Sequence, residues 1–152
     1  HDNRRDPLTG LLNRQAFYDD CLMFDKNISA VASLDMNGLK ELNDGKGHLA
    51  GDEALTRIGE CIMEAIDKDT QAYRTGGDEF LLLFFHDQEE RIIKIGKQIK
   101  ENVIRSGYHI SVGYAMRAKD TELETAISES DQRMYADKAR YYQESGRERR
   151  RR

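Results

Sequence analysis

The chain has 152 residues, a length typical of one domain with a sizeable core, so the sequence predicts a single domain over residues 1–152, with a core of about 6–144 and a basic tail of about 145–152. Hydrophobic residues make up 38% and charged residues 34%, with one proline, which is typical of a globular protein rather than of a disordered chain. The formal net charge of -4 argues against broad nucleic-acid binding, and no apolar run approaches the roughly 18 residues that would cross a bilayer.

Hydrophobic periodicity predicts an alternation of helices and strands. In chain order, the predicted elements are a helix over 13–24, a strand over 28–35, a helix over 50–66, strands over 71–74 and 80–85, a helix around 92–103, a strand over 108–116 and a helix from about 123. This order implies an α/β sandwich whose sheet contains at least one antiparallel pair, formed by the two strands on either side of residue 77.

Two of these elements carry local signals. The first helix is predicted from Ala16, Phe17, Leu22 and Met23, which we expect on its buried side. The two consecutive strands are joined by the sequence TGGDE at 75–79, which predicts a hairpin because glycine tolerates a positive φ.

Three carboxylates stand where predicted strands end. Asp35 closes the strand over 28–35, and Asp78 and Glu79 lie in the hairpin turn, which could lie beside it. Magnesium prefers such oxygen ligands and commonly reaches a nucleotide through one or two carboxylates plus phosphate oxygens. Because two ions can hold the attacking and the leaving oxygen of an in-line displacement at phosphorus, the pattern predicts phosphoryl or nucleotidyl transfer. Gly76 and Gly77 would let a substrate approach the backbone of the turn.

Two other metal and phosphate motifs do not fit. The stretch 35–38 resembles the opening of an EF-hand calcium loop, but Leu39 stands where the third oxygen ligand belongs, and the glycine comes too early. No GxxxxGK[ST] string occurs in the chain, so phosphates would be held by metal, backbone amides and Lys40.

Four ordered blocks together resemble the GGDEF diguanylate cyclases. They are DPLTGLLNR (6–14), LDMNGLKELNDGKGHLAGD (34–52), YRTGGDEF (73–80) and SDQRMYADKARYY (130–142), and they cover nearly the whole chain. The resemblance implies a palm-like sandwich related to nucleotidyl cyclases, with a central mixed or antiparallel sheet of about five strands and helices on both faces. It also implies the activity of a diguanylate cyclase, a nucleotidyltransferase that condenses two GTP molecules into cyclic di-GMP and two pyrophosphates.

The resemblance implies a role for each residue that matches a family motif. Asp35, the Met36 carbonyl and Asp78 would bind magnesium, and Glu79 would complete or support a second metal position, giving two ions per GTP site, with manganese as an alternative. The catalytic residues would be Asp35, Asp78 and Glu79. The implied substrate-binding residues are Asn43 and Asp52 for guanine, Lys40, Lys138 and the backbone around Gly38 and Leu39 for the phosphates, and Gly76 and Gly77 for close approach.

Three positions depart from the family pattern. The second acid of the strand motif is Asn37 here. The inhibitory product-binding RxxD of many members is replaced by the residues DKDT at 67–70, so no inhibitory product site is predicted. The phosphate-binding arginine expected on the last helix is Tyr142, and the sequence leaves open whether Arg140 or Arg147 replaces it, or whether the Arg-rich tail has a function.

Partners and rival functions also follow from the resemblance. Each family domain holds one GTP, so a second GGDEF domain, in a homodimer, would be the catalytic partner, and we expect this domain to contact neither nucleic acid nor membrane. One rival is a catalytically silent GTP-binding regulatory module, against which the intact carboxylates argue. Another is a hybrid cyclic GMP-AMP synthase, against which Asp52 argues because such relatives usually carry a smaller residue there.

The cellular location is predicted only for the domain. The chain begins with His1 rather than methionine, so we expect a segment of a longer protein whose sensory or membrane parts lie elsewhere. Cys21 and Cys61 match no metal or disulfide spacing and favour free thiols, which suits a reducing compartment. We therefore expect a cytoplasmic domain, and the residues leave open whether its parent is anchored in a membrane.

Overall fold

The computed structural model describes the backbone of residues 3–151 and the side chains of residues 3–146, so the side chains of the basic tail from Arg147 onward are not described. In chain order, its elements are α1 (Arg14–Met23), the 3-10 turn η1 (Asp25–Asn27), β1 (Ala30–Asn37), α2 (Leu39–Lys46), α3 (His48–Ala65), β2 (Thr70–Arg74), β3 (Glu79–Phe84), α4 (Glu89–Arg105), β4 (His109–Met116) and α5 (Leu123–Arg151). Every element predicted from the sequence is present, and α2 and η1 are additional. Within the described residues, no helix is long and apolar enough to cross a membrane.

The strands form one sheet in the order β2-β3-β1-β4, and each neighbouring pair is antiparallel. The expected α/β sandwich is therefore confirmed, while the described residues contain four strands rather than about five. The segment before α1 comes nearest to a fifth, because Leu12 makes isolated bridges with Arg5 and with Tyr73 of β2. It does not extend the ladder, since the chain turns through Pro7 and Gly10 between these residues.

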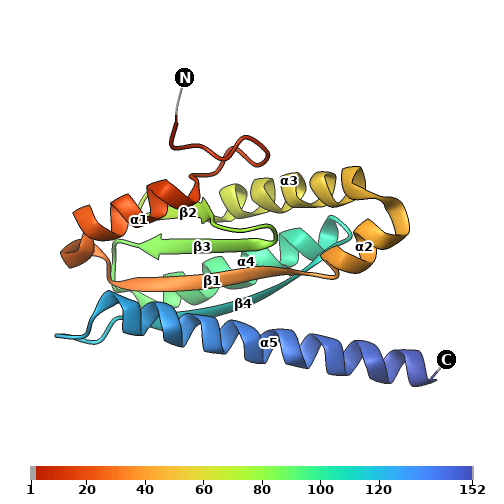
Figure 1. Cartoon of the computed structure of the whole chain (residues 1–152). Helices are drawn as coiled ribbons and strands as arrows, with labels where there is room; N and C mark the ends of the chain where they lie inside the picture. The colour runs from red at the N-terminus through yellow and green to blue at the C-terminus, as the bar shows by residue number, and fades with distance from the viewer. Residues whose placement is uncertain (1–2, 152) are drawn as a thin grey trace.

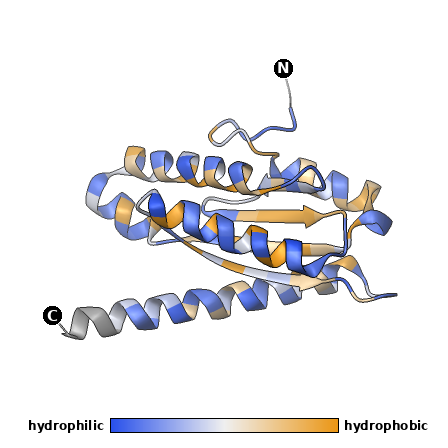
Figure 2. Cartoon of the chain, turned by 180° about the vertical axis from the view of Figure 1, so that it is seen from behind, coloured by the Kyte–Doolittle hydropathy of each residue, from blue (hydrophilic) through white to orange (hydrophobic). Residues whose placement is uncertain are grey.

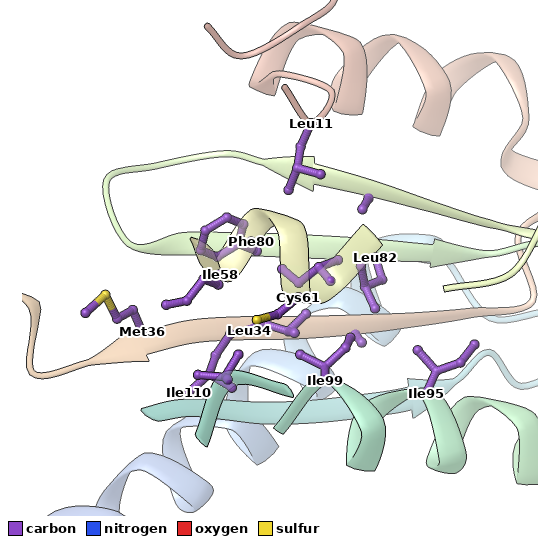
Figure 3. Close-up of a cluster of buried hydrophobic side chains, with 14 of the residues drawn as sticks. Leu11, Leu34, Met36, Ile58, Cys61, Phe80, Leu82, Ile95, Ile99 and Ile110 are labelled. Carbon is purple, nitrogen blue, oxygen red and sulfur yellow. The ribbon is translucent and has the colours of Figure 1, made fainter. Parts of the chain in front are cut away.

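Helices cover both faces of the sheet (Figure 1). One face packs against α3 and α4 through the cluster that Figure 3 shows, in which Leu34, Phe80 and Leu82 meet Ile58 and Ile99. The other face packs against α1 and α5. Successive residues of β3 alternate between the two clusters, as the two-residue period of a strand requires. Figure 2 shows the result: strands with many hydrophobic residues lie between helices in which hydrophilic and hydrophobic residues alternate.

The buried side of α1 differs from the expectation. Ala16 and Phe17 are buried, but Leu22 and Met23 are 83% and 75% exposed, so their predicted inward orientation is wrong. The residue that faces inward instead is Asp20, which accepts hydrogen bonds from the Tyr73 hydroxyl at 2.6 Å and from Arg4 at 2.8 and 3.0 Å. The buried carboxylate is stabilised there because Arg4 pairs with its charge and Tyr73 donates a hydrogen bond to it.

Candidate active site

The three predicted carboxylates meet where the end of β1 lies beside the β2–β3 hairpin. Asp35 is directly opposite Glu79 in the β1–β3 ladder. The next residue of β1, Met36, donates its backbone N–H to the Asp78 carbonyl at 2.9 Å, which fixes the hairpin turn against the strand. Asp35 and Asp78 are 43 residues apart in sequence, yet the strand end and the turn bring them into one acidic site.

The hairpin turn is shaped by an arginine, and the expected positive φ at its glycines is absent. Gly76 and Gly77 both lie outside the positive-φ region. Gly76 instead leaves room for Glu79, whose carboxylate oxygen would be 3.2 Å from an added Cβ. Arg74 donates to the Gly77 carbonyl at 2.9 and 3.2 Å, and its guanidinium is 3.2 Å from the carboxylate of Asp6. The ion pair between Asp6 and Arg74 thus links the stretch 6–14 to the hairpin.

The site concentrates negative charge in a partly buried place. Burial and the nearby Asp78 carboxylate raise the pKa of Asp35 to about 7, against the opposing effect of Lys138, whose Nζ is 3.3 Å from Asp35 Oδ1. Burial, followed by the charges of Asp131 and Asp78, also raises the pKa of Glu79. Two carboxylates that hinder each other's ionisation are stabilised by a cation placed between them.

The donor set fits a hard divalent cation. Asp35 Oδ1 is buried and forms an ion pair with Lys138 rather than a well-aligned hydrogen bond. The Asp78 carboxylate and the Met36 carbonyl belong to the same strand end and turn. Within the described residues, no three His, Cys, Asp or Glu side chains converge as a complete metal cage. Magnesium needs no such cage, because it binds proteins through one or two carboxylates and takes its other ligands from water and phosphates.

The predicted guanine-binding pair lies on the two helices that follow β1. Asn43 of α2 has a buried Oδ1 without a hydrogen-bond partner, and Asp52 of α3 is exposed. Gly51 lets the Asn43 side chain lie against α3, because an added Cβ at Gly51 would be 1.9 Å from Asn43 Oδ1. A cavity of about 470 Å³ beside Met36 and Gly38 is lined by neither member of the pair.

The predicted phosphate contacts lie around the start of α2 and along α5. Gly38 caps α2 with a φ of 79°, and Lys40 is exposed in the first turn, after Leu39. The Gly38 N–H donates to the Tyr142 hydroxyl at 3.1 Å. Arg140, a candidate for the missing arginine, is instead 3.2 Å from Asp137, and the side chain of Arg147 lies outside the described residues.

The docking of α5 onto the sheet involves residues that the sequence did not single out. The Ser33 hydroxyl of β1 lies 2.7 Å from that of Ser130. Gly113 of β4 allows the close approach, since an added Cβ there would be 2.2 Å from the backbone N of Met134. These contacts place Lys138 and Tyr142 over the end of β1. No local pattern could have indicated them, because each depends on a residue remote in sequence.

The stretch at the position of the RxxD motif is engaged in internal contacts. Asp67 and Asp69 both pair with Arg91 of α4, the second at 3.3 Å, and Asp67 also accepts from the Thr70 hydroxyl at 2.8 Å. These contacts fix the turn between α3 and β2 against α4.

The antiparallel sheet between two helical layers, with carboxylates where its central strand meets a hairpin, defines a palm-like α/β domain. A family model described as diguanylate cyclase, GGDEF domain, matches residues 3–143. The chain therefore belongs to the GGDEF family.

Relatives and solved structures agree with this assignment. Probable diguanylate cyclase DgcJ of Escherichia coli is 30% identical over 148 residues, 90% of this chain and 30% of that protein. Diguanylate cyclase DgcN of the same organism is 34% identical over 145 residues, 86% of this chain and 36% of that protein, so the chain spans about a third of these curated relatives. The GGDEF domain of DgcB from Caulobacter crescentus, solved in complex with cyclic di-GMP, has a TM-score of 0.81 and 26% identity, covering 91% of this chain and 92% of that chain.

Proposed function

We propose that this chain is a diguanylate cyclase domain, which joins two GTP molecules into cyclic di-GMP and releases two pyrophosphates. The observation that carries the proposal is the meeting of the Asp35 and Asp78 carboxylates at the end of β1, where the buried Asp35 oxygen is paired with Lys138. Membership of the GGDEF family and the likeness to curated diguanylate cyclases support it.

Different residues of the site would bind the metal ions and the phosphates. Asp35, Asp78 and the Met36 carbonyl would hold magnesium or manganese, with Glu79 supporting a second ion. When bound, these ions would favour deprotonation of the 3'-hydroxyl of one GTP and stabilise charge on the α-phosphate of the other. Lys138 now neutralises Asp35 and could pair with a phosphate once a cation has taken its place.

Base selection would come from Asn43 and Asp52. The unpartnered Oδ1 of Asn43 can accept a hydrogen bond from guanine, and the Asp52 carboxylate can accept from the guanine amino group. Adenine presents a different edge, with no amino group at that position. The pair therefore supports GTP over ATP, and over the hybrid cyclic GMP-AMP activity.

Catalysis would need two copies of the domain. One domain offers one guanine-reading pair and one acidic site, while the product contains two nucleotides. Two domains held face to face would make the attack of one GTP on the other effectively intramolecular. The curated relatives are about three times as long as the match, which leaves room for dimerising segments.

The decisive experiment tethers the domain to a dimeric coiled coil and incubates it with GTP and magnesium. We expect cyclic di-GMP, identified by mass, and none above background from Asp78→Ala, because that variant loses a metal carboxylate. Asp87→Ala, which removes an exposed carboxylate outside the site, is the matched control and should keep the activity.

Two other outcomes would redirect the proposal. GTP binding without any product from the tethered dimer would identify a silent GTP-binding module instead. A mixed product from equal GTP and ATP would identify the hybrid synthase.

We also propose that the domain works in the cytoplasm, where GTP is available. An uncharacterised membrane protein of Staphylococcus haemolyticus is 28% identical over 116 residues, which are 33% of that protein. A cyclase domain carried by a membrane-anchored parent is compatible with this relative. Fractionation of cells that express the full parent protein would test the location.

A further inference from the structure

One face of α5 contacts the two groups of the site that a metal-bound nucleotide would need. Lys138 and Tyr142 are four residues apart, so they lie on the same side of the helix. Lys138 Nζ is 3.3 Å from Asp35 Oδ1, and the Tyr142 hydroxyl oxygen is 3.1 Å from the Gly38 amide nitrogen. In the proposed function, Asp35 binds the metal and the Gly38 amide meets the terminal phosphates.

The Tyr142 contact differs in kind from the one an arginine would make. The hydroxyl oxygen accepts a hydrogen bond from the Gly38 N–H, whereas a guanidinium has only donors and cannot accept a hydrogen bond from a backbone N–H. An arginine at this position would leave the amide free and add a positive charge. The tyrosine instead uses the amide and adds no charge.

The tyrosine ring is held in place by its neighbours. The rings of Tyr142 and Tyr141 meet edge to face with centroids 5.1 Å apart, and the Tyr141 ring is 5.0 Å from that of His109 on β4. His109 is paired with Asn37 of β1, one residue before Gly38. The rings of Tyr142, Tyr141 and His109 therefore pack in a row, and His109 connects this row to the end of β1 next to Gly38.

We propose that the Tyr142 hydroxyl occupies the position of a phosphate oxygen on the Gly38 amide, so that the terminal phosphates of the nucleotide must displace it. Tyr142 thereby lowers the affinity of the domain for the triphosphate. This inference rests on the proposed function, because it needs GTP to bind with its terminal phosphates at Gly38.

The test compares the chain with its Tyr142→Phe variant, which keeps the ring and removes only the hydroxyl. Titration calorimetry with magnesium and a GTP analogue that has a non-hydrolysable α,β bridge should give a Kd about two- to tenfold lower for the variant, as expected for one competing neutral hydrogen bond. The Kd for GMP, which lacks the terminal phosphates, should not change. Tyr135→Phe, the same change at an exposed tyrosine of α5, is the matched control and should bind like the original chain.

Three results would overturn the inference. An unchanged Kd for the analogue would show that the hydroxyl does not compete, and a higher Kd would show that it binds the phosphates. A Gly38 amide resonance that is identical in the nucleotide-free original and Tyr142→Phe proteins would show that the contact does not form. Failure of the original chain to bind the analogue at all would instead overturn the proposed function, while the resonance comparison would still report on the contact.

Discussion

Gly51 is buried where α2 meets α3, in a place where the side chain of Asn43 fills the space that a methyl group would need. The amide of Asn43, which we propose binds guanine, is therefore positioned by the absence of a side chain on the next helix. The sequence marks Asn43 and Asp52 through the family motif, but the dependence on Gly51 becomes visible only when the helices are packed.

Gly51→Ala should separate binding from folding. Asn43 must move away from the added Cβ, so the Kd for a GTP analogue should rise about tenfold, as for the loss of a well-placed polar contact. Alanine is the better helix former by about 1 kcal/mol, which offsets the crowding, so the free energy of unfolding should change little. Calorimetry and urea denaturation measure the two effects.

Gly96→Ala is the control for this substitution. It adds the same methyl group to α4, where the nearest atom is Val112 Cγ1 at an ordinary 3.7 Å. It should leave nucleotide binding unchanged. Equal binding by Gly51→Ala and the original chain would refute the role assigned to Gly51.

The hydroxyl of Tyr73 stabilises the buried carboxylate of Asp20. Burial and the hydrogen bond to Asp20 raise the pKa of Tyr73, so it stays a donor across the neutral range. Tyr73→Phe leaves Asp20 with one partner fewer in a buried place and should lower the free energy of unfolding by about 1–3 kcal/mol. Tyr114→Phe removes the hydroxyl from an exposed bond to Glu89 and should cost clearly less in the same urea titration.

Among the elements, those with strong periodicity were predictable and those without it were not. The strands follow short apolar runs or, in β4, an alternating pattern, and the helices α3, α4 and α5 follow helical apolar patterns; all were predicted. The helix α2 has eight residues, none of them buried, and it lies between Gly38 and Gly47. Its apolar side consists of Leu39 and Leu42, which are only partly buried against the core, so the pattern is too short to detect. Its formation depends on packing beside α3.

The same limit applies to the candidate site. The meeting of Asp35 with the hairpin acids could be predicted, because strand ends and turns are local features that share one sheet edge. The contacts of α5 could not, because Lys138 and Tyr142 meet residues that precede them by more than 100 positions, and they do so only once α5 has docked in one register. The inward orientation of Leu22 and Met23 was wrong for a related reason, since Asp20 finds its partners at Tyr73 and Arg4.

Gly113 sets the distance between α5 and the sheet. An added Cβ would be 2.2 Å from the backbone N of Met134 and 2.5 Å from the Ser130 carbonyl, and helix backbone cannot yield as a side chain can. Gly113→Ala should therefore lower the free energy of unfolding by about 1–3 kcal/mol and weaken nucleotide binding, because Lys138 moves away from the site. A stability equal to that of Gly96→Ala would contradict this account.

Asp137 holds α5 to two other elements in a pH-dependent way. Burial pushes its pKa up, but Lys100, whose Nζ is 2.5 Å away, and the Val112 amide at 2.9 Å bring its pKa below the usual 3.8. Because the pKa is lower in the folded state, this stabilisation is present above the unfolded value and is lost as the pH falls through the folded one.

Asp137→Asn should accordingly be less stable than the original chain at pH 7, by on the order of 1 kcal/mol. The difference should shrink below pH 3.8, where the carboxylate begins to be protonated even in the unfolded chain. Urea denaturation of both proteins at several pH values measures this. A difference that is constant down to the lowest pH would contradict the assigned pairing.

For the whole molecule, we predict that cyclic di-GMP does not inhibit the tethered dimer through the RxxD position. The two aspartates at that position are paired with Arg91, and no arginine is present among residues 67–70. At saturating GTP, initial rates measured with added cyclic di-GMP should therefore stay unchanged. Non-competitive inhibition by the product would contradict the prediction and indicate a different regulatory site.

The position of α5 in the chain also bears on synthesis of the protein. All four strands and the acidic hairpin lie before residue 117, whereas Lys138 and Tyr142 belong to the last element (Figure 1). During translation the sheet can form before α5, the helix that covers the end of β1, has emerged from the ribosome. Nascent chains would thus carry an exposed pair of carboxylates, without the lysine that neutralises one of them, until α5 has emerged and docked.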